Sequence, residues 1–513
     1  MRIGVDVGGT NTDAVIMQGR DVIYGNKSTT TEEPGLGIIN AVSEILDKTK
    51  TDTNQIESVM IGTTQFTNAF VENKRLEQVA IVRLGYPATI SVPPCIDFSD
   101  NLRNILGKNF WIVSGGYEFD GRFLGDWSST EIEKVAKEIF QKKLKYISVS
   151  CVFSPINEKQ EIETAKIIQL HNPDATITMS HRIGRVGFIE RENATIMNAS
   201  LGKLADKVIS SFKEALKKLN INSPFYISQN DGTLMSADIV KNYPVLTFAS
   251  GPTNSMRGAA FLSKQNNAIV VDIGGTTTDF GVIKEGFPRE SAIPVDIGGV
   301  RTNFRMPDLI SIGLGGGSLV RETNDGVSVG PDSVGYKLDS ESLIFGGNTL
   351  TTSDIAVASG DVNFGDKNKV SHINKEMIKK TQDEIKIMIE DGIDRVKLNK
   401  ESVPVILVGG GSVLVNSDLK GASEVLIPKH SDVANAIGAS LAQAGGEIDK
   451  IYSYSELGRD KSIEKAKEEA VERALQAGAI KDSIKIIELE EIPLSYLPSG
   501  SVRLHVKAVG DIF

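Results

Sequence analysis

Apolar and small residues alternate in two short segments that lie far apart in the chain. The first, residues 3–13, is interrupted by a pair of glycines and continues as the apolar run 14–17. Alternation broken by glycine is typical of a strand, a tight turn and a second strand. Residues 269–279 repeat the pattern. The sequence therefore predicts two β-hairpins, one near the start of each half of the chain.

The two segments also share their polar residues, position by position. A single hairpin of this kind could be only a turn, because glycine readily adopts positive φ. Two copies in register favour a duplicated functional element, since glycine amides and threonine hydroxyls can surround phosphate oxygens. Aspartates beside them can hold Mg²⁺ through water or position a nucleophile. The matched residues are Asp6 with Asp272, Gly8 and Gly9 with Gly274 and Gly275, Thr10 with Thr276, Thr12 with Thr278, and Asp13 with Asp279.

Two further segments are rich in small residues. Residues 403–415 form an apolar strand with a glycine-rich turn, a place where backbone can approach a ligand closely, although any strand-to-helix turn can have this composition. Residues 432–442 predict a helix with small residues at a spacing of four, which would pack closely on another helix. The turn consists of Gly409, Gly410, Gly411 and Ser412, and the helix face of Ala434, Gly438 and Ala442.

Composition narrows the function further. The 513 residues are enough for two or three domains. The formal charge is -10, and without a basic segment interleaved with aromatics we expect no nucleic-acid partner. Cys95 and Cys151 lie far apart and predict no metal cluster. No apolar run approaches the roughly 20 residues of a membrane span, and no targeting signal is evident at the N-terminus. We expect a cytoplasmic protein with no membrane partner.

The order of these elements resembles the superfamily of sugar kinases, heat-shock chaperones and actin. The resemblance implies an α/β fold, the two-lobed actin-like ATPase (ribonuclease H-like) fold with duplicated mixed-sheet domains, in which ATP and Mg²⁺ bind between the lobes and small-residue helices form the hinge. It implies catalytic roles for Asp6, Asp13, Asp272 and Asp279, with Asp6 and Asp272 also positioning the metal. It implies phosphate contacts from Gly8, Gly9, Thr10, Asn11, Thr12, Gly274, Gly275, Thr276, Thr277 and Thr278, and adenosine contacts from Gly409, Gly410, Gly411 and Ser412.

Within this superfamily, an ordered series of motifs resembles the hydantoinase A and oxoprolinase family, which includes N-methylhydantoinase and an acetone carboxylase subunit. Residues 6–13 are similar to its Asp-Val-Gly-Gly-Thr-Phe-Thr-Asp, with Asn11 in place of the aromatic residue. Its Gly-Thr-Thr and Thr-Asn-Ala motifs are similar to residues 62–64 and 67–69, and its Glu-Arg-x-x-x-Thr-x-x-Asn-Ala to residues 190–199. The motifs 250–252 and 315–318 follow in family order.

The family resemblance implies an ATP-dependent hydrolase component that phosphorylates a small cyclic amide or carbonyl compound for ring opening, with a hydantoinase B-type subunit as partner. A homo-oligomer is compatible with the sequence. Two departures bear on the substrate: Ile189 replaces the tyrosine before Glu-Arg, and 329–335 replace a glycine- and proline-rich stretch. The implied substrate residues are Thr63, Thr64, Asn68, Glu190 and Arg191.

Simpler interpretations exist for some of these residues. Thr63, Thr64 and their neighbours could cap a helix over 65–74, because threonine is a good N-cap residue. Glu190 and Arg191 could form a structural ion pair. His181 and His372 are single histidines, which more often form structural hydrogen bonds than act as bases or ligands.

We expect three regions: a first ATPase lobe with a helix-rich substrate insertion over 1–267, a second lobe with the adenosine turn over 268–448, and a small α/β appendage over 449–513 containing a helix and two strands. The leading function is the cyclic amidohydrolase component. A kinase for a small, sugar-like metabolite is the alternative. A chaperone, filament or reactivating ATPase is a third class, but the region after 449 is too short for a peptide-binding domain.

Overall fold

The computed structural model describes residues 1–9, 11–31, 33–291, 294–303, 306–323, 326–397, 399–415, 418–494 and 500–512. Thr10 of the first predicted phosphate loop lies outside the described residues.

Both predicted hairpins are present and have the same pairing. In the first, β1 (Arg2–Val7) pairs antiparallel with β2 (Asn11–Gln18), so that Asp6 faces Asp13. In the second, β11 (Ala268–Ile273) pairs with β12 (Thr278–Lys284), so that Asp272 faces Asp279. Each first strand also has a parallel neighbour, β4 (Ser58–Thr63) for β1 and β19 (Val403–Val408) for β11. The two lobes therefore share one topology at their centres.

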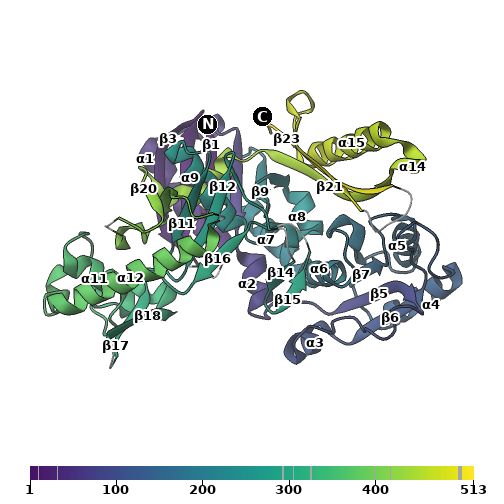
Figure 1. The fold of residues 1–513 in the computed structure, drawn as a ribbon, viewed down its shortest axis with the longest axis horizontal. Helices are drawn as coiled ribbons and strands as arrows, with labels where there is room; N and C mark the ends of the chain where they lie inside the picture. Colours follow the sequence, from purple (N-terminus) through teal and green to yellow (C-terminus); the bar gives the residue numbers. More distant parts are fainter. Residues whose placement is uncertain are drawn as a thin grey trace.

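The hairpins belong to two different sheets (Figure 1). Among the described residues, the first sheet has nine strands, in the order β22 (Lys485–Pro493), β23 (Ser501–Gly510), β21 (Ala444–Ser453), β10 (Leu234–Ser236), β9 (Phe225–Ser228), β4, β1, β2 and β3 (Asp21–Thr29). The second has the order β13 (Phe287–Pro288), β12, β11, β19 and β20 (Ala422–Leu426), with β16 (Leu309–Ile312) also paired to β12.

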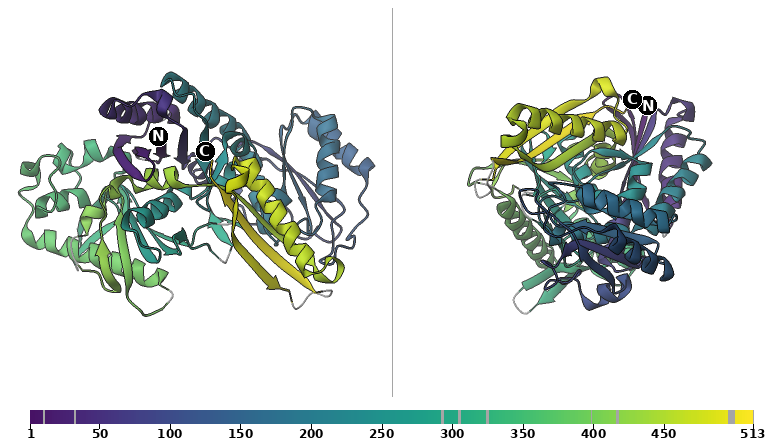
Figure 2. Two further views of the ribbon diagram at one scale, coloured as in Figure 1. Left: turned by 90° about the horizontal axis from the view of Figure 1, so that it is seen from above. Right: turned by 90° about the vertical axis from the view of Figure 1, so that its right-hand side faces the viewer.

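A third sheet lies at the far end of the molecule from the second lobe (Figures 1 and 2). Its order is β6 (Asn109–Ser114), β5 (Val79–Tyr86), β7 (Tyr146–Cys151) and β8 (Thr176–Met179), and every pair is parallel. Smaller hairpins join β14 (Val295–Ile297) to β15 (Val300–Thr302), and β17 (Ser318–Thr323) to β18 (Gly326–Ser333).

Helices cover these sheets, and their apolar faces follow the helical period. On α4, for example, Ile132, Val135, Ala136 and Ile139 are buried, and the Ser128 hydroxyl caps the helix by accepting from the Glu131 amide. The helices are α1 (Pro34–Thr49), α2 (Gln65–Val71), α3 (Asp100–Leu106), α4 (Ser129–Gln141), α5 (Lys159–His171), α6 (Ile189–Ser200), α7 (Gly202–Lys218), α8 (Ala237–Asn242), α9 (Ser250–Ser263), α10 (Leu338–Glu341), α11 (Thr352–Ser359), α12 (Lys375–Val396), α13 (Ala434–Leu441), α14 (Tyr454–Leu457) and α15 (Arg459–Ala477).

The expected two-lobed α/β fold is confirmed, with two differences in detail. The insertion expected to be helix-rich contains the parallel sheet of β5 to β8. Strands of such sheets are covered on both faces and lack alternation, as in the wholly buried β7, so the sequence pattern does not distinguish them from buried helix. The C-terminal segment contains the expected helix and two strands, and β21 joins it to the first sheet.

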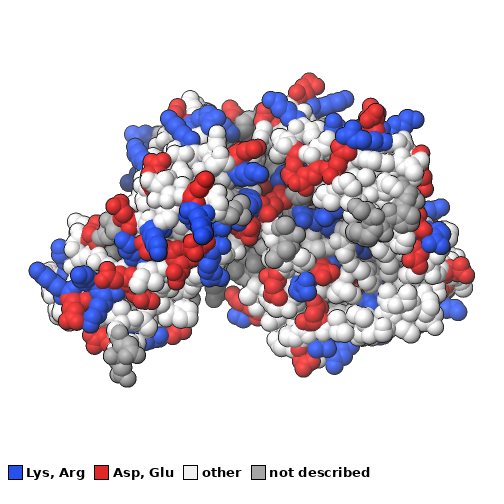
Figure 3. Space-filling view, in the orientation of Figure 1, with Lys and Arg blue, Asp and Glu red and all other residues white. Residues whose placement is uncertain are grey.

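The remaining features concern the surface. No helix of the described residues is long and apolar enough to cross a membrane. On the face shown in Figure 3, basic and acidic side chains are intermixed. The two ends of the chain lie near one another in each view of Figures 1 and 2.

Candidate active site

A cleft of about 310 Å³ brings together both hairpins and the third glycine-rich turn. The first lobe contributes residues from the turn between β1 and β2 and from β3. The second contributes the turn between β11 and β12 and the turn after β19, and α9 and α13 complete the wall. Its lining includes Gly8, Gly9, Asn11, Asp13, Lys27, Ser255, Asp272, Gly274, Gly275, Thr276, Thr277, Gly316, Phe364, Gly409, Gly410, Gly411, Val413, Leu414, Asp432 and Asn435.

The two phosphate turns have the same backbone geometry. The Gly8 amide donates to the Asn11 carbonyl at 3.0 Å, and the Gly274 amide donates to the Thr277 carbonyl at 2.9 Å. A second glycine loop supports the latter turn, because the amides of Gly316 and Gly317 donate to the carbonyls of Gly274 and Gly275 at 3.0 and 2.7 Å. Backbone contacts thus hold both turns in the same conformation.

Some predicted phosphate and adenosine residues face away from the cleft. Thr12 and Thr278 are fully buried, and their hydroxyls bond to Thr30 Oγ1 at 3.0 Å and to the Leu314 carbonyl at 2.7 Å. They alternate with Asn11 and Thr277, which line the cleft, as the period of a strand requires. Ser412 is also buried and is absent from the lining.

Asp6 and Asp13 face each other on the two strands of the first hairpin, and both side chains are buried. Asn435 Nδ2 donates to Asp6 Oδ2 at 3.0 Å, and Lys27 Nζ donates to Asp13 Oδ2 at 2.8 Å. The other carboxylate oxygen of each residue is buried and has no hydrogen-bond partner among the described residues. Since buried acceptors are normally satisfied, these two oxygens mark a place for a ligand, cation or water.

The carboxyl groups of the site resist ionisation. Burial, together with the neighbouring Asp13 and Asp272 carboxylates, raises the pKa of Asp6 to about 7. Burial also raises the pKa of Asp13 and Asp272, and that of Asp279 to about 6, although the Ser311 hydroxyl donates to Asp279. Grouped buried carboxyls of this kind are typical of functional sites and favour a cation between them.

A glycine packs against the principal aspartate of each lobe. A Cβ on Gly62 of β4 would clash with Asp6 Oδ1, and a Cβ on Gly409 after β19 would clash with Asp272 Oδ1. Gly409 also has φ +84°, which favours glycine. The duplication therefore extends from the hairpins to the adjacent parallel strands.

The helices α9 and α13 cross closely behind the cleft. A Cβ on Gly258 would clash with the Ala434 carbonyl, and one on Gly438 with the Asn254 carbonyl. The predicted packing of the small-residue helix on another helix is confirmed.

The predicted substrate residues divide into two groups. Asn68 Nδ2 donates to Thr64 Oγ1 at 3.3 Å, and a Cβ on Gly9 would lie 3.6 Å from Asn68 Nδ2, so this pair lies beside the first phosphate turn. Thr63 is buried, and its hydroxyl accepts from the Gln65 amide at 3.3 Å. Thr64 occupies the N-cap position of α2, but its side chain makes no capping bond.

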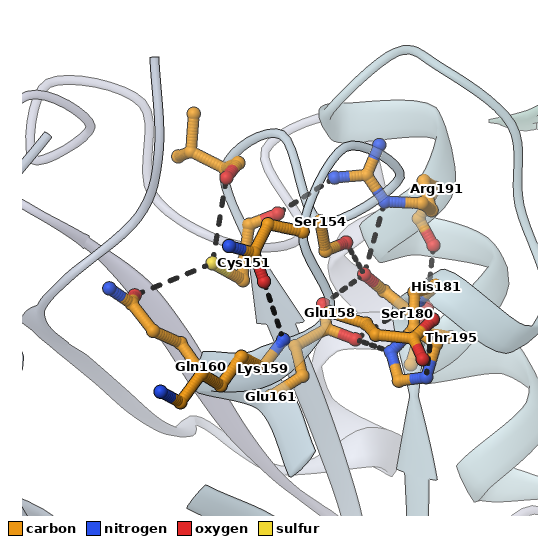
Figure 4. A network of polar contacts seen from close by, with 12 residues as sticks. Cys151, Ser154, Glu158, Lys159, Gln160, Glu161, Ser180, His181, Arg191 and Thr195 are labelled. Atoms are coloured by element: carbon orange, nitrogen blue, oxygen red, sulfur yellow. Dashed lines mark hydrogen bonds and ion pairs between the residues drawn. The ribbon is translucent and has the colours of Figure 1, made fainter. Parts of the chain in front are cut away.

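Glu190 and Arg191 lie elsewhere. Arg191 is buried on α6, where it donates to Ser180 Oγ at 3.0 Å and to the Cys151 carbonyl at 2.8 Å (Figure 4). Glu190 lies 3.8 Å from Arg301 and does not pair with Arg191. Neither residue lines the cleft.

Several residues of the cleft carry no clear signal in the sequence. Lys27 on β3 is paired with Asp13 on β2. The register of these two strands is the signal that could have identified Lys27 as a cleft residue. Asn435 is the polar residue at the start of the small-residue helix. Ser255 and Asp432 also line the cleft, but without a pattern that distinguishes them from other polar residues.

Two family models match the chain, hydantoinase/oxoprolinase N-terminal region over residues 2–171 and hydantoinase/oxoprolinase over residues 191–366. The chain belongs to the hydantoinase/oxoprolinase family. It is 25% identical to the acetophenone carboxylase gamma subunit of Aromatoleum aromaticum, over 70% of this chain and 53% of that protein. It is 24% identical to the caprolactamase subunit alpha of Pseudomonas jessenii, over 70% and 54%.

The chain thus spans about half the length of these two curated relatives. Among solved structures, the ATP-dependent caprolactamase from Pseudomonas jessenii has the same fold, with a TM-score of 0.79 at 18% identity over 99% of this chain and 87% of that chain.

Proposed function

We propose that the chain is an ATP-dependent component that transfers the γ-phosphate of ATP to the carbonyl oxygen of a small cyclic amide or related carbonyl compound. One observation carries this proposal: the glycine turns of both hairpins, with Asp13 of the first and Asp272 of the second, line one cleft. Phosphoryl transfer depends chiefly on positioning and charge stabilisation, which paired backbone turns can supply.

The residues present fit ATP and Mg²⁺. Gly8, Gly9, Gly274 and Gly275 offer backbone to the phosphates, and the unpartnered oxygens of Asp6 and Asp13 fit a cation, directly or through water. When bound, Mg²⁺ would neutralise phosphate charge. The Lys27 ammonium favours the ionised form of Asp13 against the effect of burial and holds its carboxylate in place.

The turn after β19 fits the nucleoside. Gly410 has open space where its Cβ would be, so the backbone can be approached closely there. Val413, Leu414 and Phe364 provide apolar surface in the same wall, which suits an adenine ring.

Phosphorylation answers a specific chemical difficulty of a cyclic amide. Nitrogen donates electrons into the carbonyl group, so the carbon is a poor electrophile. Moving the γ-phosphate onto the carbonyl oxygen forms an O–P bond as the bond to ADP breaks, and the carbon becomes a better target for water. Thr64 and Asn68, beside the first phosphate turn, are the side chains we propose to orient the acceptor.

We propose that ring opening is completed by a hydantoinase B-type partner subunit. Support comes from two relatives that are themselves named as subunits, the gamma subunit of acetophenone carboxylase and the alpha subunit of caprolactamase.

The test is ADP release by the purified chain with Mg·ATP and a panel of hydantoin, 5-oxoproline, caprolactam, acetophenone and glucose, with and without the partner subunit. We expect stimulation by a cyclic amide or ketone, and its loss in Asp6→Asn and Asp272→Asn. The isosteric amides keep the shape of each site while removing its charge. Stimulation by glucose alone would overturn the proposal in favour of a kinase.

A further inference from the structure

A second cavity, of about 220 Å³, lies between the 180–185 loop, the turn from β9 to β10, β21 and α15. No described residue lines both this cavity and the nucleotide cleft. We propose that it binds a small organic carboxylate, with the carboxylate at Arg182 and Arg473 and the apolar part of the molecule on Met235, Ile239 and Leu246. This site is independent of the proposed phosphoryl transfer.

The acidic residues in the cavity wall already have basic partners. Asp231 lies 2.8 Å from Lys507 Nζ, and Asp449 lies 2.6 Å from Arg503 Nη2. Glu447 Oε1 lies 3.1 Å from His505 Nε2. The basic Lys450 is likewise paired, with Glu469 at 2.7 Å and Glu158 at 3.3 Å.

Arg182 and Arg473 differ from these groups. Within the part of the chain that the structure describes, neither forms an ion pair with a carboxylate, and Arg473 Nη1 donates to the Glu447 carbonyl at 2.7 Å. Burial lowers the pKa of Arg473 most and the like charge of Arg182 lowers it further, against the Glu469 and Glu447 carboxylates, which raise it. An oxyanion between the two guanidinium groups would relieve this repulsion and accept hydrogen bonds from both.

Two buried polar atoms of the wall also lack a hydrogen-bond partner among the described residues. Asn230 Nδ2 and His181 Nε2 make no hydrogen bond among the described residues, although both residues are at least nine-tenths buried. His181 Nδ1 lies 2.6 Å from Glu161 Oε2. Because a carboxylate only accepts, Nδ1 carries a proton. The wall thus offers the Asn230 amide as a further donor in addition to the two arginines.

The wall is held in place by the buried network of Figure 4. Ser180 Oγ donates to Glu161 Oε1 at 2.5 Å, and Arg191 donates to Ser180 and to the Arg185 carbonyl at 3.1 Å. This gives Arg191 a positioning role for the 180–185 loop.

Size and polarity limit the ligand. The cavity is smaller than the roughly 300 Å³ at which pockets for drug-sized molecules begin. With apolar side chains in the same wall as the arginines, it fits a carboxylate on a short hydrocarbon chain better than an inorganic anion.

The probe is hexanoate, titrated calorimetrically into the full chain without nucleotide. Hexan-1-ol and hexylammonium have the same chain with a neutral or cationic head. We expect saturable binding of hexanoate, at least tenfold weaker binding of hexan-1-ol and no binding of hexylammonium. Arg182→Gln and Arg473→Gln should each lower the affinity for hexanoate at least tenfold. Arg182→Lys should lower this affinity by less than Arg182→Gln does.

Two control variants complete the test. Arg459→Gln, at an exposed arginine of α15 outside the cavity, should bind hexanoate as the parent does. Asp6→Asn should also bind normally, which separates this site from the ATP site. Equal binding of hexanoate and hexan-1-ol would overturn the inference. So would unchanged affinity in folded Arg182→Gln, where the exposed side chain can be replaced without disturbing the core.

Discussion

Asn435 donates a hydrogen bond of 3.0 Å to Asp6, although the two residues lie 429 positions apart. Asp6 belongs to the first hairpin, and Asn435 to α13, which packs on α9 behind the cleft. α13 also packs on β1, β2 and β4, strands of the sheet that carries Asp6. The buried carboxylate is therefore oriented by a helix from a distant part of the chain that covers its own sheet.

We first predict that Asn435→Ala lowers ATP turnover by about tenfold or more, because a hydrogen bond to a charged group contributes about 1.5–3 kcal/mol. The measurement is steady-state ADP release with saturating Mg·ATP. Asn104→Ala, at an exposed position of α3, is the control and should retain parent activity. Parent-like turnover in Asn435→Ala would show that Asp6 needs no orientation by α13.

The second prediction separates two adjacent glycines. Gly410→Val should fold normally but lose nucleotide binding, since its Cβ meets no atom within 4 Å and the residue lines the cleft. Gly409→Val should destabilise the protein, because Gly409 has φ +84° and its Cβ would clash with Asp272 and Ile273. Thermal unfolding and binding of a fluorescent ATP analogue distinguish the two. A Gly410→Val protein with parent affinity would contradict the adenosine assignment.

Much of the fold was predictable because the glycine-rich hairpin motif, a weak signal by itself, occurs twice in the chain with the same polar residues. The matching of Asp6 with Asp272 predicted both hairpins, and their pairing in the structure is the same. Strands β5 and β7 were not predicted, since parallel strands covered on both faces carry no alternating pattern.

The parts of the site that are formed by backbone could be predicted from the sequence. The parts in which side chains from distant elements meet were harder to predict. Glycine turns appear directly in the sequence. Lys27 was missed because its partner Asp13 is defined by strand register, and Asn435 because its contact crosses most of the chain. Arg191 was assigned by family motif alone, and one of its contacts, the Arg185 carbonyl, belongs to a residue of the second cavity's wall.

The third prediction concerns the ion pair of Lys27 with Asp13. Lys27→Met should lower the free energy of unfolding at pH 7 by about 1–2 kcal/mol, because it leaves the buried Asp13 carboxylate without its cation. Adding Asp13→Asn should recover most of this loss, because the uncompensated charge is then gone. Urea unfolding of both variants is the measurement, and a double variant no more stable than Lys27→Met would contradict the assignment.

The last prediction is that Asp6 lowers the free energy of unfolding although it is required for ATP turnover. Its pKa is raised from 3.8 to about 7 in the folded protein, chiefly by burial and then by the Asp13 carboxylate. The folded state therefore holds this proton more tightly than the unfolded state, and its stability falls as pH rises from about 4 to 7. Asp6→Asn removes this dependence. In metal-free buffer with EDTA, the variant should be more stable than the parent by up to about 4 kcal/mol at pH 8 and by less than half of that at pH 5. Urea unfolding at both pH values measures the difference, with Asp21→Asn at an exposed position of β3 as the control. The same Asp6→Asn protein should have lost ATP turnover. A variant that is equally stable at both pH values relative to the parent would show that Asp6 is ionised throughout, and that its carboxylate is compensated in the folded chain.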